Sequence, residues 1–183
     1  MDGPAFGDAE PDPESVAQAI VYRQLAASAK SRLQLSRKLA ERNVPEYVAE
    51  AVLDKFQAAG LINDAEFAAM WVRSRAQSRK LARGALRREL SDKGIDAEFA
   101  DAALAQVTDS DEEEAARALV QRKLRPGVDL SDRTERDRTT RRLASMLARK
   151  GYQPSQAFRI VNEVLGVQAA RESDSGGMES RYP

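Results

Sequence analysis

The chain has 183 residues, of which 42% are hydrophobic and 5% aromatic, and its 29 basic residues balance 29 acidic ones. Cysteine and histidine are both absent, which excludes disulfides, zinc sites built on these ligands, thiol nucleophiles and the usual histidine base. The sequence also lacks a glycine-rich nucleotide fingerprint and an apolar run long enough to span a membrane. We therefore expect a cytoplasmic, non-catalytic binding protein with no metal and no cofactor.

Alanine, leucine and long charged residues dominate the chain, which is typical of an all-helical protein. The first predicted helix opens at Asp12-Pro13, and the second carries Leu33 to Leu39. Further helices are predicted from Pro45 to Gly60, from Asp64 to Arg79, over 83–93, after the turn at Lys93-Gly94-Ile95, and from Asp109 to Leu124. Pro126-Gly127 separates these from a last pair of helices. Residues 1–11 and 167–183 are rich in Gly, Pro, Ser and acids, and we expect them to be disordered tails.

One pattern occurs three times: a Leu-x-x-x-Leu pair, then a basic residue, a Gly or Asn, and an apolar residue. The Leu pairs are Leu35/Leu39, Leu86/Leu90 and Leu143/Leu147, and the turns are Arg42-Asn43-Val44, Lys93-Gly94-Ile95 and Lys150-Gly151-Tyr152. The middle residue of each turn occupies the position after a helix where a positive φ is expected. The sequence thus predicts an all-α, elongated tandem array of three three-helix repeats, at 12–60, 61–108 and 109–166.

Charge is segregated along the chain although its sum is zero. Residues 1–14 carry five acids and no base, whereas 30–42 carry five bases and one acid. Eight bases and two acids lie in 73–93, and 96–114 then carry eight acids and no base. Such blocks predict separate basic and acidic faces.

We assign the basic blocks to a binding face for a phosphate backbone or an acidic groove. Its candidate residues are Arg37, Lys38, Arg42, Arg79, Lys80, Arg83, Arg87, Arg88, Arg149 and Lys150. Arg141 and Arg142 lie in a comparable place in the third repeat. In a second interpretation the central arginines pair with the acidic stretch 96–114 of the same molecule, and in a third all these charges only solvate the helices.

The helix from Asp64 has an apolar stripe that includes Trp71, and Arg75 falls inside that stripe. A charge in an apolar stripe must be paired or must reach water. We expect Arg75 to pair with Glu89 on the next helix, and Trp71 to belong to the core rather than to stack on a base.

Two stretches of the sequence resemble the central signature of the RecX family, the bacterial regulators of the RecA recombinase. They are Phe67-Ala68-x-x-Trp71-Val72-x-Ser74-Arg75 and Gly84-x-Leu86-x-x-Glu89-Leu90-x-x-Lys93-Gly94-Ile95. Ser31-Arg32-x-x-Leu35-x-x-Lys38-Leu39 and Leu147-Ala148-Arg149-Lys150-Gly151-Tyr152 are similar to the first and third repeats of the family. The structural signature residues are Phe67, Trp71, Arg75, Leu86, Glu89, Leu90 and Gly94. The resemblance covers about residues 15–165, in an actinobacterial style.

The resemblance implies a monomeric modulator whose partners are RecA and the RecA–single-stranded-DNA filament. It implies inhibition of strand exchange, ATP hydrolysis and co-protease activity in DNA recombination, DNA repair and the SOS response, together with weak binding to DNA. Two other readings of the residues stay open: a helical-repeat protein that binds nucleic acid independently of RecA, and a scaffold.

Overall fold

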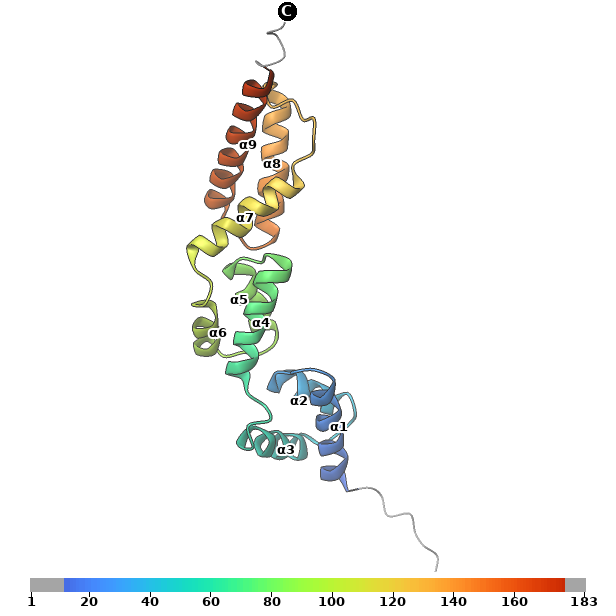
Figure 1. Ribbon diagram of the computed structural model, residues 1–183. Coiled ribbons are helices and arrows are strands. Elements are labelled where there is room, and N and C mark those ends of the chain that lie inside the picture. The colour runs from blue at the N-terminus through green and yellow to red at the C-terminus, as the bar shows by residue number, and fades with distance from the viewer. Residues whose placement is uncertain (1–11, 177–183) are drawn as a thin grey trace, which may run out of the picture. The chain divides into compact units, whose positions relative to one another are not determined.

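The structure is a computed structural model that describes residues 12–176, with side chains through residue 170. Within this range the chain forms nine α-helices and no strand, which confirms the all-α class (Figure 1). The helices are α1 (Pro13–Ala27), α2 (Arg32–Ala40), α3 (Glu46–Ala58), α4 (Asp64–Arg79), α5 (Arg83–Asp92), α6 (Ala97–Leu104), α7 (Asp109–Lys123), α8 (Arg133–Arg149) and α9 (Pro154–Gly176). Their order follows the expected helices closely.

The described residues group into two compact units. The first unit extends to Ala68 and also includes Leu90–Ala100, and the second consists of Ala69–Glu89 and the described residues from Asp101 onward. Helices α4, α5 and α6 therefore contribute residues to both units. The division into three repeats at 60/61 and 108/109 stays a prediction from the sequence.

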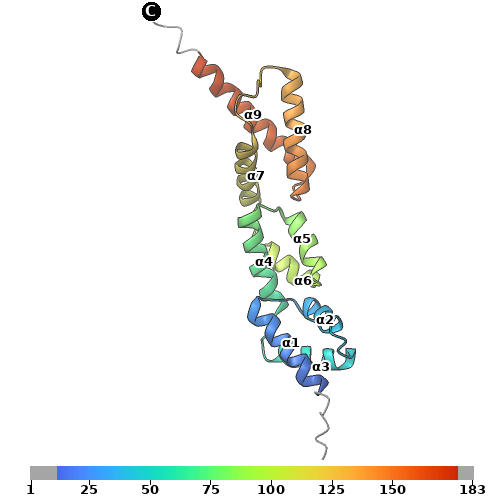
Figure 2. The ribbon, with the colours of Figure 1, turned by 90° about the vertical axis from the view of Figure 1, so that its right-hand side faces the viewer.

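Each unit has an apolar core formed by the Leu pairs of the repeated pattern and the helices around them. In the first unit Leu35 and Leu39 of α2 are buried against α1 and α3. In the second unit Leu143 and Leu147 of α8 are buried against α7 and α9. Figures 1 and 2 both show α8 and α9 side by side.

The second helix of each predicted repeat ends in the same backbone turn. Its middle residue has a positive φ: 57° at Asn43, 72° at Gly94 and 91° at Gly151. The next amide donates to the carbonyl of the second Leu: Val44 to Leu39 at 3.2 Å, Ile95 to Leu90 at 3.1 Å and Tyr152 to Leu147 at 3.3 Å. The expected left-handed turns are thus confirmed.

In the first unit, a carboxylate from α4 caps the start of α2. The amide of Arg32 donates to Oδ1 of Asp64 at 2.9 Å, and the Ser31 hydroxyl donates to the carbonyl of Lys93 at 2.7 Å. Burial raises the pKa of the Asp64 carboxyl, and the nearby Asp96 adds to the rise, against the lowering effect of the Arg32 amide. The α2 N-terminus is therefore fixed by residues distant in sequence.

The second unit repeats this arrangement at the start of α5. The amide of Arg83 donates to the carboxylate of Glu112 from α7, and the amide of Ala82 donates to the carbonyl of Lys150 at 3.0 Å. Glu112 is buried, which a carboxylate tolerates only when it is hydrogen-bonded or paired. Gly84 lies at the same junction, where an added Cβ would come within 2.7 Å of the Gly151 carbonyl oxygen.

The C-terminal boundary differs from the sequence prediction. We expected residues 167–183 to be disordered, but α9 continues to Gly176. Ala169 still packs against the core of the second unit, so the apolar face of α9 continues past the predicted end of the repeat. The predicted tail at 1–11 and the last residues, 177–183, lie outside the described part of the chain.

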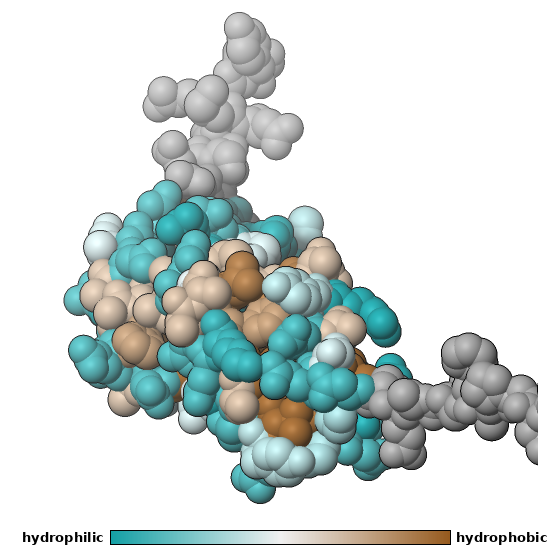
Figure 3. Space-filling view, turned by 90° about the horizontal axis from the view of Figure 1, so that it is seen from below, coloured by the Kyte–Doolittle hydropathy of each residue, from teal (hydrophilic) through white to brown (hydrophobic). Residues whose placement is uncertain are grey.

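Some large apolar side chains remain on the surface. Tyr47 is 78% exposed and Tyr22 is 57% exposed, although the Tyr22 ring makes an edge-to-face contact with Phe56. On the face seen in Figure 3, hydrophobic residues lie among hydrophilic ones. Scattered residues of this kind are normal on a protein surface and do not by themselves indicate an interface.

Candidate functional site

The signature residues of the central segment form a polar contact at the edge of the apolar stripe. The indole N–H of Trp71 donates to Oε2 of Glu89 at 2.8 Å. The Arg75 guanidinium lies over the Trp71 ring, 4.1 Å from its centroid, and its Nε lies 3.9 Å from Glu89. The predicted Arg75–Glu89 pair is thus confirmed. Trp71 is half-buried rather than a core residue, so that expectation was wrong.

The other signature positions are structural. Leu86 and Leu90 are fully buried, and Phe67 is buried on α4. Gly94 ends α5 with the positive φ that the turn needs, and an added Cβ there would lie 2.5 Å from the Leu33 side chain. These residues determine how the helices pack. Any contact with a binding partner therefore depends on other residues, at the surface.

The two arginines at the centre of the predicted basic face are engaged within the molecule. Arg83 pairs with Asp109, and its Nε lies 3.4 Å from Glu112. Arg87 pairs with Asp101. This is the intramolecular pairing with stretch 96–114 that the sequence offered as a second interpretation, and for these two residues the geometry favours it.

The candidates in the first unit are held only loosely. Lys38 pairs with Glu41 at 2.7 Å within the same helix end. A guanidinium nitrogen of Arg37 lies 3.3 Å from the carbonyl of Asp92. Arg42 is exposed in the turn after α2. Contacts of this kind are weak and exchange readily with solvent or a partner.

The remaining candidates lie in the second unit at helix ends. Lys150 follows α8 and donates from Nζ to the carbonyl of Arg79, the last residue of α4, at 2.6 Å. Arg149 donates to the hydroxyl of Ser145 at 2.9 Å and is exposed. Lys80 has an unusual positive φ of 53°, and its carbonyl accepts the hydroxyl of Tyr152 at 3.1 Å. Arg88 is exposed on α5.

Sequence reasoning missed two cations that lie close to Lys150, at the C-terminal end of α8. Arg122 and Lys123 form the last turn of α7, and both are exposed. The guanidinium of Arg142 reaches the carbonyl of Lys123 at 3.5 Å. The sequence does carry a signal for them, because the same helix begins with acidic residues and ends with the basic residues Arg122 and Lys123. Only its acidic start entered the sequence interpretation.

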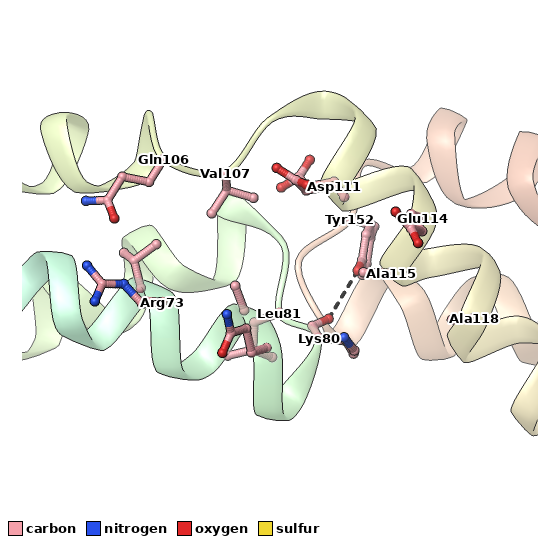
Figure 4. Close-up of a pocket in the computed structure, with 14 residues that line it drawn as sticks. Arg73, Lys80, Leu81, Gln106, Val107, Asp111, Glu114, Ala115, Ala118 and Tyr152 are labelled. Atoms are coloured by element: carbon pink, nitrogen blue, oxygen red, sulfur yellow. Dashed lines mark hydrogen bonds between the residues drawn. The ribbon is translucent and has the colours of Figure 1, made fainter.

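A cleft of about 580 Å³ lies in the second unit between α4 and α7 (Figure 4). Arg73 and Lys80 lie on the α4 side, and Asp111 and Glu114 lie on the α7 side. Tyr152 also lines the cleft; burial raises its pKa to about 12, and Glu112 adds to the rise. The walls therefore present opposite charges to anything that enters.

Residues 12–176 contain no group of acidic side chains arranged to hold a metal ion. No helix in the same range is both long and apolar enough to cross a membrane.

Comparison with known proteins gives a consistent family match. Residues 17–56 match the model of the first three-helix domain of RecX, and 63–104 match that of the second. The regulatory protein RecX of Streptomyces coelicolor is 47% identical over 159 residues, which cover 87% of this chain and 82% of that protein. The Thermobifida fusca regulatory protein RecX is 40% identical over 183 residues, with 100% and 92% covered.

Solved structures show the same fold. The crystal structure of RecX from Lactobacillus salivarius superposes with a TM-score of 0.70 at 22% identity, over 85% of this chain and 98% of that one. A second crystal structure, of a regulatory protein RecX, gives 0.69 at 24% identity, over 89% and 81%. With its nine described helices and its matches along most of its length, this chain belongs to the RecX family of regulatory proteins.

Proposed function

We propose that this protein binds the RecA filament on single-stranded DNA and inhibits its recombinase, ATPase and co-protease activities. The observation that carries the proposal is the family membership, at 47% identity to a regulatory protein RecX over 87% of the chain. In this proposal it acts without catalysis or a cofactor, as a cytoplasmic monomer, and restrains RecA in DNA recombination, DNA repair and the SOS response.

The surface chemistry is compatible with a partner that repeats along a filament. Helical modules joined in one chain can each make a modest contact, and linked contacts bind far more tightly than any one alone. The loosely held cations of the first unit and the helix-end cations of the second provide such contacts. A filament partner would therefore meet several weak sites rather than one deep pocket.

The test is RecA-catalysed ATP hydrolysis on single-stranded DNA with increasing amounts of this protein. We expect hydrolysis to fall, and a fall at much less than one protein per RecA would indicate that the protein caps growing filament ends. Unchanged hydrolysis at equimolar protein would overturn the proposal.

The alternative, a nucleic-acid-binding protein independent of RecA, predicts a different response in the same assay. Such a protein lowers hydrolysis only by occupying the DNA, so adding more single-stranded DNA would restore the rate. Inhibition that persists in excess DNA supports a contact with the recombinase itself.

A further inference from the structure

The end of α4 is held by the turn that follows α8. Lys150 Nζ donates to the carbonyl of Arg79 at 2.6 Å, and the hydroxyl of Tyr152 donates to the carbonyl of Lys80 at 3.1 Å. Lys80 itself has a φ of 53°, in a region of backbone conformation that residues other than glycine rarely adopt. Hydrogen bonds from a distant part of the chain therefore hold two adjacent carbonyls, one of them on a residue with an unfavourable backbone.

The start of α5 is held by α7. The amide of Arg83 donates to the carboxylate of Glu112, which is only 7% exposed. The preceding residue, Ala82, lies at the N-cap position, because the amides of Ala85 and Leu86 donate to its carbonyl. Its methyl group offers no oxygen to the free amides of the first turn, so the carboxylate of Glu112 replaces a local cap.

The matching helix start in the first unit has a cap of its own. Ser31 corresponds to Ala82 in the repeated pattern, and its hydroxyl accepts the amide of Gln34 at 3.3 Å. The amide of Ser31 in turn donates to the side chain of Gln34 at 3.1 Å, which completes a capping box. Asp64 adds an external carboxylate at the amide of Arg32. Of these two helices, α5 alone relies on the external carboxylate.

The local sequence favours a helix straight through the turn between α4 and α5. Residues 79–83 read Arg-Lys-Leu-Ala-Arg, and all of these are good helix formers. None of them is a glycine, a proline or one of the small polar residues that usually cap a helix. The break at 80–82 therefore depends on the contacts from α7 and from the turn after α8.

The same contacts lie at the cleft between α4 and α7. Lys80, Leu81, Glu112 and Tyr152 all line this cleft, and Figure 4 shows the hydrogen bond between Tyr152 and Lys80 there. A molecule in the cleft would touch the residues that hold the turn. The conformation of the turn and the shape of the cleft are therefore coupled.

We propose that Glu112, Lys150 and Tyr152 form a latch, which acts as a conformational switch in the second unit. With the latch closed, the turn between α4 and α5 is ordered as described. When the latch opens, Lys80 leaves its positive φ and the first turn of α5 frays, which changes the wall of the cleft. Opening of this kind is a local equilibrium that contacts at either side of the turn can bias. The inference goes beyond the proposed function and requires no partner protein.

Amide hydrogen exchange of the full chain, followed by NMR, measures how often the first turn of α5 opens. The test variant, Glu112→Ala, removes the acceptor of the Arg83 amide. The control, Asp64→Ala, removes the matching carboxylate at α2, where the capping box remains. Circular dichroism and the fluorescence of Trp71, the only tryptophan of the chain, verify that the variants stay folded.

We expect the amides in the first turn of α5 to exchange roughly ten-fold faster or more in Glu112→Ala, because a hydrogen bond to a charged group is lost. In Asp64→Ala the amides in the first turn of α2 should exchange no more than about three-fold faster. Adding Ala82→Ser to Glu112→Ala supplies a local cap and should restore most of the protection. Equal acceleration in test and control, or no rescue by Ala82→Ser, would overturn the proposal.

A second variant tests the end of α4 and does not depend on the folding of Glu112→Ala. Lys150→Met/Tyr152→Phe removes both hydrogen bonds to that end. We expect the Cα chemical shift of Lys80 to move toward the value of a right-handed helix. Asn43, whose φ of 57° lies in a turn outside the latch, should keep its shift in the same sample. An unchanged shift at Lys80 would overturn the proposal, whatever the exchange rates show.

Discussion

The indole N–H of Trp71 donates to Glu89 at 2.8 Å, while Arg75 covers the ring of the same tryptophan. One carboxylate therefore serves both a neutral donor on α4 and a cation one turn further along that helix. This contact explains why the central signature combines an aromatic, an arginine and a glutamate on two helices. It also places Trp71 at the edge of the core rather than inside it.

Replacing Glu89 should separate its two roles. Glu89→Gln keeps an acceptor for the indole and removes only the charge, so we expect a loss of less than about 1 kcal/mol in the free energy of unfolding. Glu89→Ala also removes the hydrogen bond to a charged group, and we expect about 2 kcal/mol. Urea unfolding measures both values, and equal losses would contradict the assigned role of the indole bond.

Replacing Gly151 tests the junction between α5 and the turn after α8. A Cβ at Gly151 would collide with the backbone nitrogen of Ala85, in addition to the strain of a φ of 91°. Gly127 is the matched control because its φ is 76° and its Cβ would meet open space. We expect Gly127→Ala to cost about 1 kcal/mol and Gly151→Ala about 3 kcal/mol or more. Similar thermal unfolding of the two variants would show that the junction is loose.

Tyr152 makes the stability depend on pH in the alkaline range. Its folded-state pKa is raised to about 12 from 10.0. As the pH rises through this window, the unfolded chain loses the proton first, so the folded state binds more protons and stability falls. Tyr152→Phe should lose about 1 kcal/mol at neutral pH with the hydrogen bond to Lys80. The difference in stability between the two proteins should shrink above pH 10.0, because only the parent protein has the Tyr152 hydroxyl, whose titration lowers stability there. Denaturant midpoints at several pH values test this.

Charge reversal at the two central arginines should act on stability first. Arg83→Glu/Arg87→Glu places new carboxylates beside Asp109 and Asp101, the partners of the native residues. We expect a loss of about 2 kcal/mol in the free energy of unfolding. Arg88→Glu is the control, because Arg88 is exposed and a surface change usually costs no more than about 0.5 kcal/mol. If the double variant is as stable as the parent protein, the intramolecular pairs contribute nothing to stability, and the assignment of Arg83 and Arg87 to a binding face would be favoured instead.

The helices and their turns were predictable because local signals decide them. The Leu pairs mark the buried face, and Asn43, Gly94 and Gly151 mark the turns with positive φ. Both signals act within a few residues of one another. The Arg75–Glu89 pair was predictable for a related reason: an arginine inside an apolar stripe must be paired or must reach water, and Glu89 on the next helix offers a partner.

Local signals do not predict whether a basic side chain pairs within the molecule or faces a ligand. Whether Arg87 faces a ligand or Asp101 depends on how α5 and α6 pack, and a charge block looks the same in both cases. The role of Glu112 as a cap for α5 was hidden for the same reason, because it lies far along the chain from Arg83. The end of α9 was set too early because its Gly- and Ser-rich composition outweighed a continuing apolar face.

Sedimentation of preformed RecA filaments tests the central claim most directly. Filaments are assembled on single-stranded DNA with a non-hydrolysable ATP analogue, mixed with this protein and pelleted, alongside the same DNA without RecA. We predict that the protein pellets with the filaments in saturable amounts, and much more strongly than with the DNA alone. Equal recovery with bare DNA, or no recovery with the filaments, would contradict a regulator that acts on RecA.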